Sequence, residues 1–149
     1  VIDMGIKGYP PHHDIIFKGL HAVDVDSCAS RKEAEQRILP FIPDTSTQQF
    51  LLKSLYWIEE GKLAWRFNVP ALENNIQKIL APLPIGNFNG PTLFLTGGKS
   101  SYVLSSDHEE IQAVFPQVIF TEIPGAGHWV HAEAPKEFLA GIVNFLNLT

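Results

Sequence analysis

His128 lies in a short stretch of small residues between two regular patterns, in PGAGHWVHAEAP (residues 124–135). A β-like run, QVIFTEI, precedes this stretch, and a helix-like run, residues 135–148, follows it. A loop histidine is usually solvated and inert. A histidine held in a tight, glycine-bracketed turn at the end of a strand can instead serve as a general base. His128 is therefore the first candidate catalytic residue.

Two other polar residues follow apolar runs that we expect to be strands. Asp3 ends VID, and Ser100 follows PTLFLTGGK. Ligands of parallel sheets bind at the carboxyl ends of the strands, so Asp3, Ser100 and His128 are expected at one edge of a sheet. Asp3 either caps a turn, as loop aspartates often do, or orients the histidine and stabilises its charged form.

A nucleophile is harder to find in the sequence. A nucleophile elbow requires G-x-S-x-G, and this pattern is absent from the 149 residues. The GKSSY segment carries Tyr102 where the last glycine would stand, so Ser100 is a poor candidate. Cys28 follows a polar segment without a positioned base, and we expect it to be inert.

Metal binding is a weaker interpretation of the same loop. His128, His131 and Glu133 offer ligand atoms, but their spacing fits no familiar metal site. His12 and His13 are expected to be a solvated loop pair. No metal or organic cofactor is expected.

The pattern of apolar residues predicts the elements that position these side chains. Helices are expected at residues 14–23, 30–39, 45–56, 71–80, 105–115 and 135–148; strands are expected at 1–4, 91–96 and 118–123, with a short segment at 62–68 that favours extended structure. Ser30 and Glu33 form a capping-box pattern. Strand and helix alternate after residue 90, which predicts parallel strands in an α/β fold. Residues 1–4 and 71–149 are expected to form the core, and residues 5–70 a helical insertion.

Composition limits the classes of function. The chain is 45% hydrophobic with a formal net charge of −5 and scattered basic residues, which disfavours nucleic acid and anionic membranes as partners. No apolar run reaches the length of a membrane span. The single cysteine favours a reducing compartment, the cytoplasm or, in a eukaryote, the mitochondrion. The sequence opens within a strand-like run, VIDM, and we expect it to be part of a larger protein.

These motifs, taken together, resemble the α/β-hydrolase fold in its carboxylesterase branch. GAGHWVHAEAP with FLAGIVNFL resembles the last strand, histidine loop and last helix of that family; PTLFLTGGKSSYV resembles the preceding strand and turn, and VIDM the strand before the cap. QFLLKSL, WRFNVPAL and GGKSSYV resemble a narrower group, the small esterases related to YbfF and abhydrolase-11. The whole chain is covered, as the C-terminal part of the family's domain.

The resemblance also implies which residue is the acid. Most members carry an aspartate in the turn after the penultimate strand, where this sequence has Ser100. Asp107 lies too far along, inside the next helix. In some branches the acid follows the strand before the cap, and Asp3 occupies that place. Ser100 is then expected to donate a hydrogen bond to the Asp3 carboxylate, beside His128.

The resemblance implies a serine-type hydrolase of small carboxylic esters. Its nucleophilic serine and oxyanion hole would lie in a missing N-terminal half, of the same protein or of a second chain, against which this chain is expected to pack. Residues 5–70 would form a cap over the site. The expected substrate-binding residues are Trp129, Tyr102, Trp57, Trp65, Phe67 and Phe50. Thioester, lactone or haloalkane hydrolysis, and a non-catalytic binding module, remain alternatives.

Overall fold

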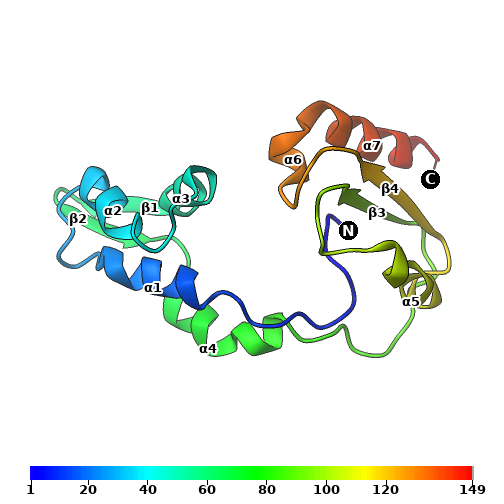
Figure 1. The fold of residues 1–149 in the computed structure, drawn as a ribbon, viewed down its shortest axis with the longest axis horizontal. Coiled ribbons are helices and arrows are strands. Elements are labelled where there is room, and N and C mark those ends of the chain that lie inside the picture. Colours follow the sequence, from blue (N-terminus) through cyan, green and yellow to red (C-terminus); the bar gives the residue numbers. More distant parts are fainter. Residues whose placement is uncertain (149) are drawn as a thin grey trace. The chain divides into compact units, whose positions relative to one another are not determined.

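The computed structural model describes residues 1–148, and the chain divides into two compact units (Figure 1). The sheet unit combines Val1–Gly8 with the chain from Pro82 onward, and the helical unit is Tyr9–Ala81. The sheet unit contains parallel strands with flanking helices, which confirms the predicted α/β class.

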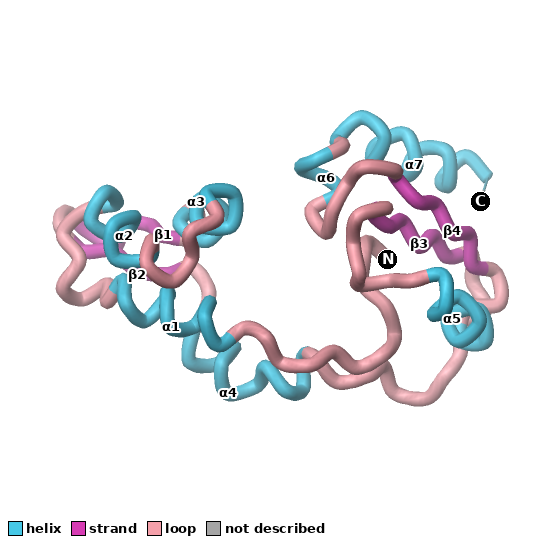
Figure 2. Tube along the Cα trace, in the orientation of Figure 1, coloured by secondary structure: helices cyan, strands magenta, loops and turns pink. Residues whose placement is uncertain are grey.

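Two parallel strands form the centre of the sheet unit. β3 (Thr92–Gly97) pairs with β4 (Val118–Ile123) along its whole length, and Figure 2 shows the two strands side by side. The N-terminal residues lie along the other side of β3, where Ile2 forms a parallel bridge with Leu95. The predicted strand at residues 1–4 is therefore a single bridge, and the carboxyl ends of all three segments point the same way.

Helices cover both faces of this sheet. Side chains of a strand alternate between its faces, and β3 carries apolar side chains on both. Leu93 and Leu95 face α7 (Pro135–Leu148), which contributes Phe138, Ile142 and Phe145 to the packing. Phe94 faces the opposite side, with Ile111 of α5 (His108–Val114). A 3-10 turn, η1 (Ser105–Asp107), leads into α5, and α6 (Val130–Glu133) lies between β4 and α7. All six residues of β3 are buried, as expected for a central strand.

The helical unit has its own core. It contains α1 (Asp14–Val23), α2 (Arg31–Ile38), α3 (Thr45–Leu52), β1 (Leu55–Glu59), β2 (Lys62–Trp65) and α4 (Val69–Ile79). Ser30, Asp44 and Asn68 cap the three later helices by accepting backbone N–H groups from the first turn. The predicted capping box is only half formed, because the Glu33 carboxylate accepts the N–H of Ala29.

The predicted helix over residues 45–56 is wrong at its C-terminal end. α3 ends at Leu52, and Leu55 begins β1, which pairs antiparallel with β2. Gly61, with φ of 77°, occupies the turn between the strands. The buried residues Leu55 and Leu63 join the helical core, and this packing favours a hairpin over another helical turn.

The boundary between the units also differs from the expected one. The expected division after residue 70 falls inside α4, whereas the whole helix lies in the helical unit. Val69 is buried in the core of that unit, and Ile76 packs against the same core. Describing the helical unit as a cap remains a prediction.

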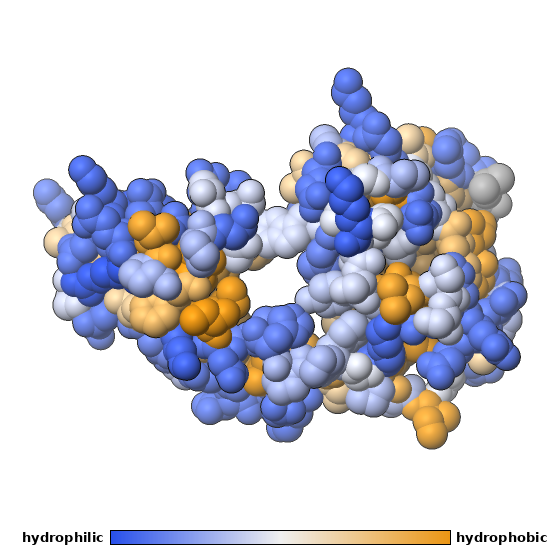
Figure 3. Space-filling view, viewed as in Figure 1, coloured by the Kyte–Doolittle hydropathy of each residue, from blue (hydrophilic) through white to orange (hydrophobic). Residues whose placement is uncertain are grey.

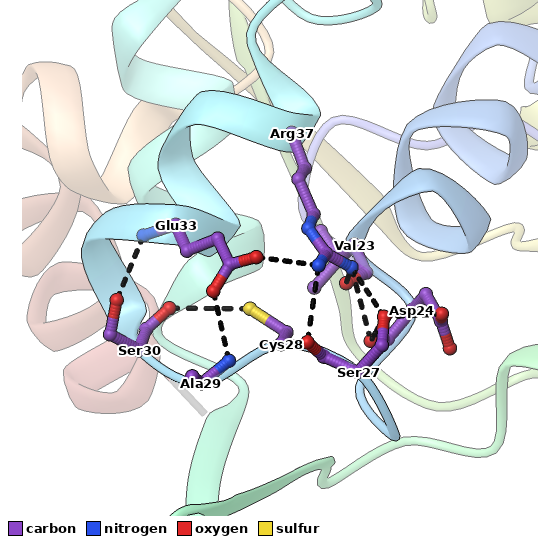
Figure 4. A network of polar contacts seen from close by, with 8 residues as sticks. All are labelled: Val23, Asp24, Ser27, Cys28, Ala29, Ser30, Glu33 and Arg37. Atoms are coloured by element: carbon purple, nitrogen blue, oxygen red, sulfur yellow. Dashed lines mark hydrogen bonds and ion pairs between the residues drawn. The ribbon is translucent and has the colours of Figure 1, made fainter.

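Arg37 of α2 donates hydrogen bonds to the segment that connects α1 and α2 (Figure 4). Arg37 donates to the carbonyl oxygens of Val23 and Ser27, to the Ser27 hydroxyl and to the Glu33 carboxylate. Hydrogen bonding from Ala29 N–H, together with Arg37, lowers the pKa of Glu33. The Cys28 thiol is buried beside this network and donates to the Ser30 carbonyl. Among residues 1–148, no helix has both the length and the apolar character that crossing a membrane demands.

Candidate active site

Asp3 occupies the carboxyl end of the N-terminal segment, with its side chain fully buried. Its backbone N–H donates to Leu95 O at 2.8 Å, which anchors it to β3. Its φ of 39° lies in the left-handed region, which aspartate tolerates better than most residues. This turn ends the pairing with β3 and leaves the carboxylate beside the Gly97 N–H, which donates to Asp3 Oδ1 at 3.0 Å.

The other carboxylate oxygen of Asp3 joins the two remaining candidates. His128 Nδ1 lies 2.8 Å from Asp3 Oδ2, and Ser100 Oγ donates to the same oxygen at 2.5 Å. A carboxylate accepts hydrogen bonds, so we assign the proton of the imidazole to Nδ1. Nε2 is then the acceptor, as a general base requires. The structure brings together Asp3, Ser100 and His128, the residues expected at one sheet edge.

Ser100 is held as a donor rather than as a nucleophile. Its hydroxyl donates a hydrogen bond to Asp3, and the Tyr102 backbone N–H donates to the same hydroxyl oxygen at 3.2 Å. Its own N–H donates to Gly97 O at 2.9 Å, which closes the turn after β3. A nucleophilic serine would donate its hydrogen bond to the imidazole that accepts its proton, whereas Ser100 donates to the Asp3 carboxylate.

The histidine loop (residues 124–129) lies against the turn after β3. The Lys99 N–H donates to Ala126 O at 2.9 Å, and Gly125 has φ of 85°. A Cβ on Gly97 would lie 2.6 Å from Ala126 O and even nearer the Gly127 carbonyl, so only glycine fits there. No motif in the sequence shows that Gly97 must be a glycine for this reason. Its signal was its place directly before the turn that carries Ser100.

One aromatic ring covers a face of His128. The Tyr102 ring stacks on the His128 imidazole with centroids 3.9 Å apart and planes inclined by 17°. The imidazole itself is 42% exposed, so it remains accessible to a substrate. Trp129, which follows the base, is half-buried.

The other predicted substrate-binding residues belong to the helical unit. Trp65 and Phe67 stack on each other with ring centroids 5.3 Å apart and pack against the helical core. Trp57 on β1 and Phe50 on α3 are 44% and 50% exposed. Their role in substrate binding remains a prediction.

Asp107 and a metal site are the two alternatives that the sequence disfavours. Asp107 pairs with Lys7, with Nζ and Oδ2 2.5 Å apart, and also accepts the Leu104 N–H. Burial acts to raise the pKa of Asp107, but the hydrogen bonds from Lys7 and Leu104 outweigh it, and the pKa is lowered. In the part of the chain that the structure describes, no three His, Cys, Asp or Glu residues converge as metal ligands.

The parallel strands with flanking helices are those of the C-terminal part of the α/β-hydrolase fold, and the chain belongs to this family. It is 34% identical over 153 residues to the sn-1-specific diacylglycerol lipase ABHD11 of Mus musculus, covering 98% of this chain and 50% of that protein. It is 38% identical over 135 residues to the esterase YbfF of Escherichia coli K12, covering 91% and 51%.

A solved structure gives the same result. The structure of a marine microorganism esterase matches with a TM-score of 0.91 at 31% identity, covering 97% of this chain and 59% of that one. No protein-family model matches the sequence. The chain spans about half the length of the curated relatives it matches. These relatives confirm the predicted resemblance to the group of ABHD11 and YbfF, whose members are named as lipases and esterases.

Proposed function

We propose that the protein carrying this chain is a serine-type carboxylic ester hydrolase, to which this chain contributes the acid and the base. The observation that carries the proposal is the pair of hydrogen bonds that Asp3 Oδ2 accepts, from His128 at 2.8 Å and from Ser100 at 2.5 Å. A buried carboxylate that orients a partly exposed imidazole is the arrangement that activates a hydroxyl nucleophile.

In the proposed reaction, a serine hydroxyl supplied from outside these 149 residues attacks the ester carbonyl. His128 Nε2 accepts the serine proton as the oxygen–carbon bond forms, and then gives it to the departing alcohol. Water attacks the resulting acyl-enzyme, and His128 again accepts and returns the proton. Asp3 holds Nδ1–H throughout and stabilises the imidazolium that forms in each step.

The nucleophile and the oxyanion hole are assigned to the half of the fold that this chain does not contain. G-x-S-x-G is absent from the sequence, and the chain covers about half of its relatives. Backbone N–H groups of that half would stabilise the tetrahedral intermediate. Ser100 supports Asp3 by donating to it and does not attack the substrate.

The complementary half is also the proposed partner of the exposed apolar surface of the sheet unit. Val1 and Ile2 are about half exposed beside β3, and Leu139, Val143 and Leu146 are exposed along α7. A groove lined by Ile2, Leu93, Ile142 and Phe145 lies between them. Figure 3 shows hydrophobic surface, in orange, on this unit. Apolar surface of this extent favours burial against another part of the protein.

Substrate contacts are proposed for aromatic residues in both units. Trp129 follows His128 directly and Tyr102 covers one face of its ring, and both are proposed to contact an acyl or alcohol group. Trp57, Trp65, Phe67 and Phe50 of the helical unit are proposed to contact the apolar part of the ester. These residues predict a preference for esters with hydrophobic groups.

The proposal is tested with the full-length protein and p-nitrophenyl butyrate. We expect turnover that a fluorophosphonate abolishes, and peptide mass spectrometry should locate the label on a G-x-S-x-G serine outside this chain. His128→Asn should remove both turnover and labelling. A label on Ser100, or full turnover by His128→Asn, would refute the assignment. Absence of any turnover by the wild-type protein would favour a non-catalytic binding module.

A further inference from the structure

The contact between Asp3 and His128 does not explain how the backbone on either side of His128 is held in place. Asp3 fixes the imidazole through Nδ1, but the histidine is carried by a loop between β4 and the four-residue helix α6. That loop contains Gly125 and Gly127, which add backbone freedom. A base must be placed to within a fraction of an ångström of its nucleophile, so such a loop needs further restraint.

Glu133 provides a bond on each side of the base. Its Oε2 accepts the Gly127 N–H at 2.9 Å, and its Oε1 accepts the Trp129 N–H at 3.3 Å. Gly127 and Trp129 are the residues immediately before and after His128. The two oxygens of one carboxylate therefore bridge the backbone N–H groups of the two residues that flank the histidine.

The absence of a side chain at residue 127 leaves room for this bridge. A Cβ at Gly127 would lie 3.0 Å from Glu133 Oε1 and 3.3 Å from Oε2, closer than most Cβ contacts. A larger residue would push the carboxylate away from the Gly127 N–H. Gly127 and Glu133 are thus matched in size and hydrogen bonding.

Glu133 is itself anchored to the core of the sheet unit. Its own N–H donates to Trp129 O at 2.9 Å, within the single turn of α6. Val130, in the same turn, is completely buried in the cluster that contains Leu95 and Ile123. The Glu133 side chain is exposed, and its bridge connects a glycine-containing loop to the turn of α6 that Val130 anchors in this core, through hydrogen bonds to a charged carboxylate.

We propose that Glu133 is a positioning residue for His128, because its carboxylate bridges the backbone N–H groups of the residues before and after the base and fixes where the imidazole is presented. Its consequence for catalysis rests on the proposed esterase function, whereas the bridge itself does not. Glu133 touches neither the imidazole nor the substrate in this role. It acts on the backbone, while Asp3 acts on the ring.

The test compares Glu133→Gln and Glu133→Ala in the full-length protein, with Glu137→Gln, an exposed glutamate in the first turn of α7, as the matched control. Gln keeps the size of the side chain but has one acceptor oxygen in place of two. We expect kcat for p-nitrophenyl butyrate to fall about tenfold in Glu133→Gln and up to a hundredfold in Glu133→Ala, with KM within about twofold of wild type. Glu137→Gln should match wild type.

A spectroscopic measurement separates the bridge from activity. In ¹⁵N-labelled protein, the Gly127 and Trp129 amide protons should move upfield in both Glu133 variants and stay in place in Glu137→Gln. An otherwise unchanged spectrum shows that the fold is intact. Unchanged amide shifts, or a raised KM with normal kcat, would overturn the proposal. If the wild-type protein hydrolyses no ester, the proposed function fails while the amide shifts still decide the bridge.

Discussion

Asp3 and His128 are separated by 125 positions in the sequence, yet His128 Nδ1 lies 2.8 Å from Asp3 Oδ2. The pair forms because the N-terminal segment, β3 and β4 run parallel, which brings Asp3, at the end of the first, and the histidine loop, after the last, to the same edge of the sheet. The buried carboxylate then meets a partly exposed ring. This contact, with Ser100 as the second donor to Asp3 Oδ2, is the basis of the proposed esterase function.

Replacing Gly97 tests the close approach between the turn after β3 and the histidine loop. In Gly97→Ala the new Cβ would collide with the backbone carbonyls of Ala126 and Gly127, which cannot move aside as a flexible side chain would. We expect a loss of about 1–3 kcal/mol in the free energy of unfolding, measured with urea, and a lower kcat.

Gly86→Ala is the matched control, because a Cβ at that position would meet nothing within 4 Å. It should leave both stability and kcat near their wild-type values. Equal stability of the two variants would contradict the close approach.

Ser100→Ala tests the difference between a supporting donor and a nucleophile. The variant removes one hydrogen bond to the Asp3 carboxylate and the acceptor for the Tyr102 N–H. Loss of one hydrogen bond to a charged group predicts a fall in kcat of about tenfold, measured with p-nitrophenyl butyrate. A complete loss of turnover in a folded variant would instead make Ser100 the nucleophile, and an unchanged kcat would remove its supporting role.

The ion pair between Lys7 and Asp107 predicts a dependence of stability on pH. The pKa of Asp107 is lowered in the folded chain, so the pair stabilises the protein above the unfolded pKa of about 3.9. That contribution is lost as the pH falls through the folded-state value. Urea unfolding between pH 7 and pH 2.5 should show this loss in the wild type.

Asp107→Asn should lack that acid-dependent part of the stability and be less stable than the wild type at neutral pH. Asp26→Asn, at an exposed aspartate of the helical unit, should keep the wild-type profile. The interpretation fails if both variants follow the same curve as the wild type.

Arg37→Ala should destabilise the helical unit. The guanidinium group holds the carbonyl oxygens of Val23 and Ser27, which end α1 and begin the connection to α2. Its removal deletes the hydrogen bonds to these carbonyl oxygens, which then have only water as a donor. We expect a loss of about 2 kcal/mol in the free energy of unfolding. Lys32→Ala, an exposed change on the same helix, should cost less than about 0.5 kcal/mol.

The sequence predicted the sheet unit better than the helical unit. β4 and α7 have the bounds expected from their apolar patterns, since continuous apolar runs and a 3.6-residue period are strong local signals. β2 lies within residues 62–68, where the sequence predicts extended structure, but β1 is not predicted, because Phe50, Leu51, Leu52 and Leu55 have helical spacing. Tertiary packing of Leu55 against the helical core decided in favour of the strand.

The candidate site was predictable only in part. Strand ends placed Asp3, Ser100 and His128 on one edge, but choosing Asp3 as the acid required the family resemblance. Glu133 was considered only as a weak metal ligand, because its bonds are to backbone N–H groups and no side-chain motif announces them. Gly97 likewise owes its role to a contact across the fold, with the Gly127 carbonyl.

The most direct test of the account is kcat for p-nitrophenyl butyrate in Asp3→Asn of the full-length protein, with Asp107→Asn as the control. Asparagine also tolerates the left-handed backbone of residue 3, so the fold should be retained. We predict a fall in kcat on the order of 10³- to 10⁴-fold for Asp3→Asn and a change within about twofold for Asp107→Asn. Near-normal turnover by folded Asp3→Asn would contradict the assignment of Asp3 as the acid that orients His128.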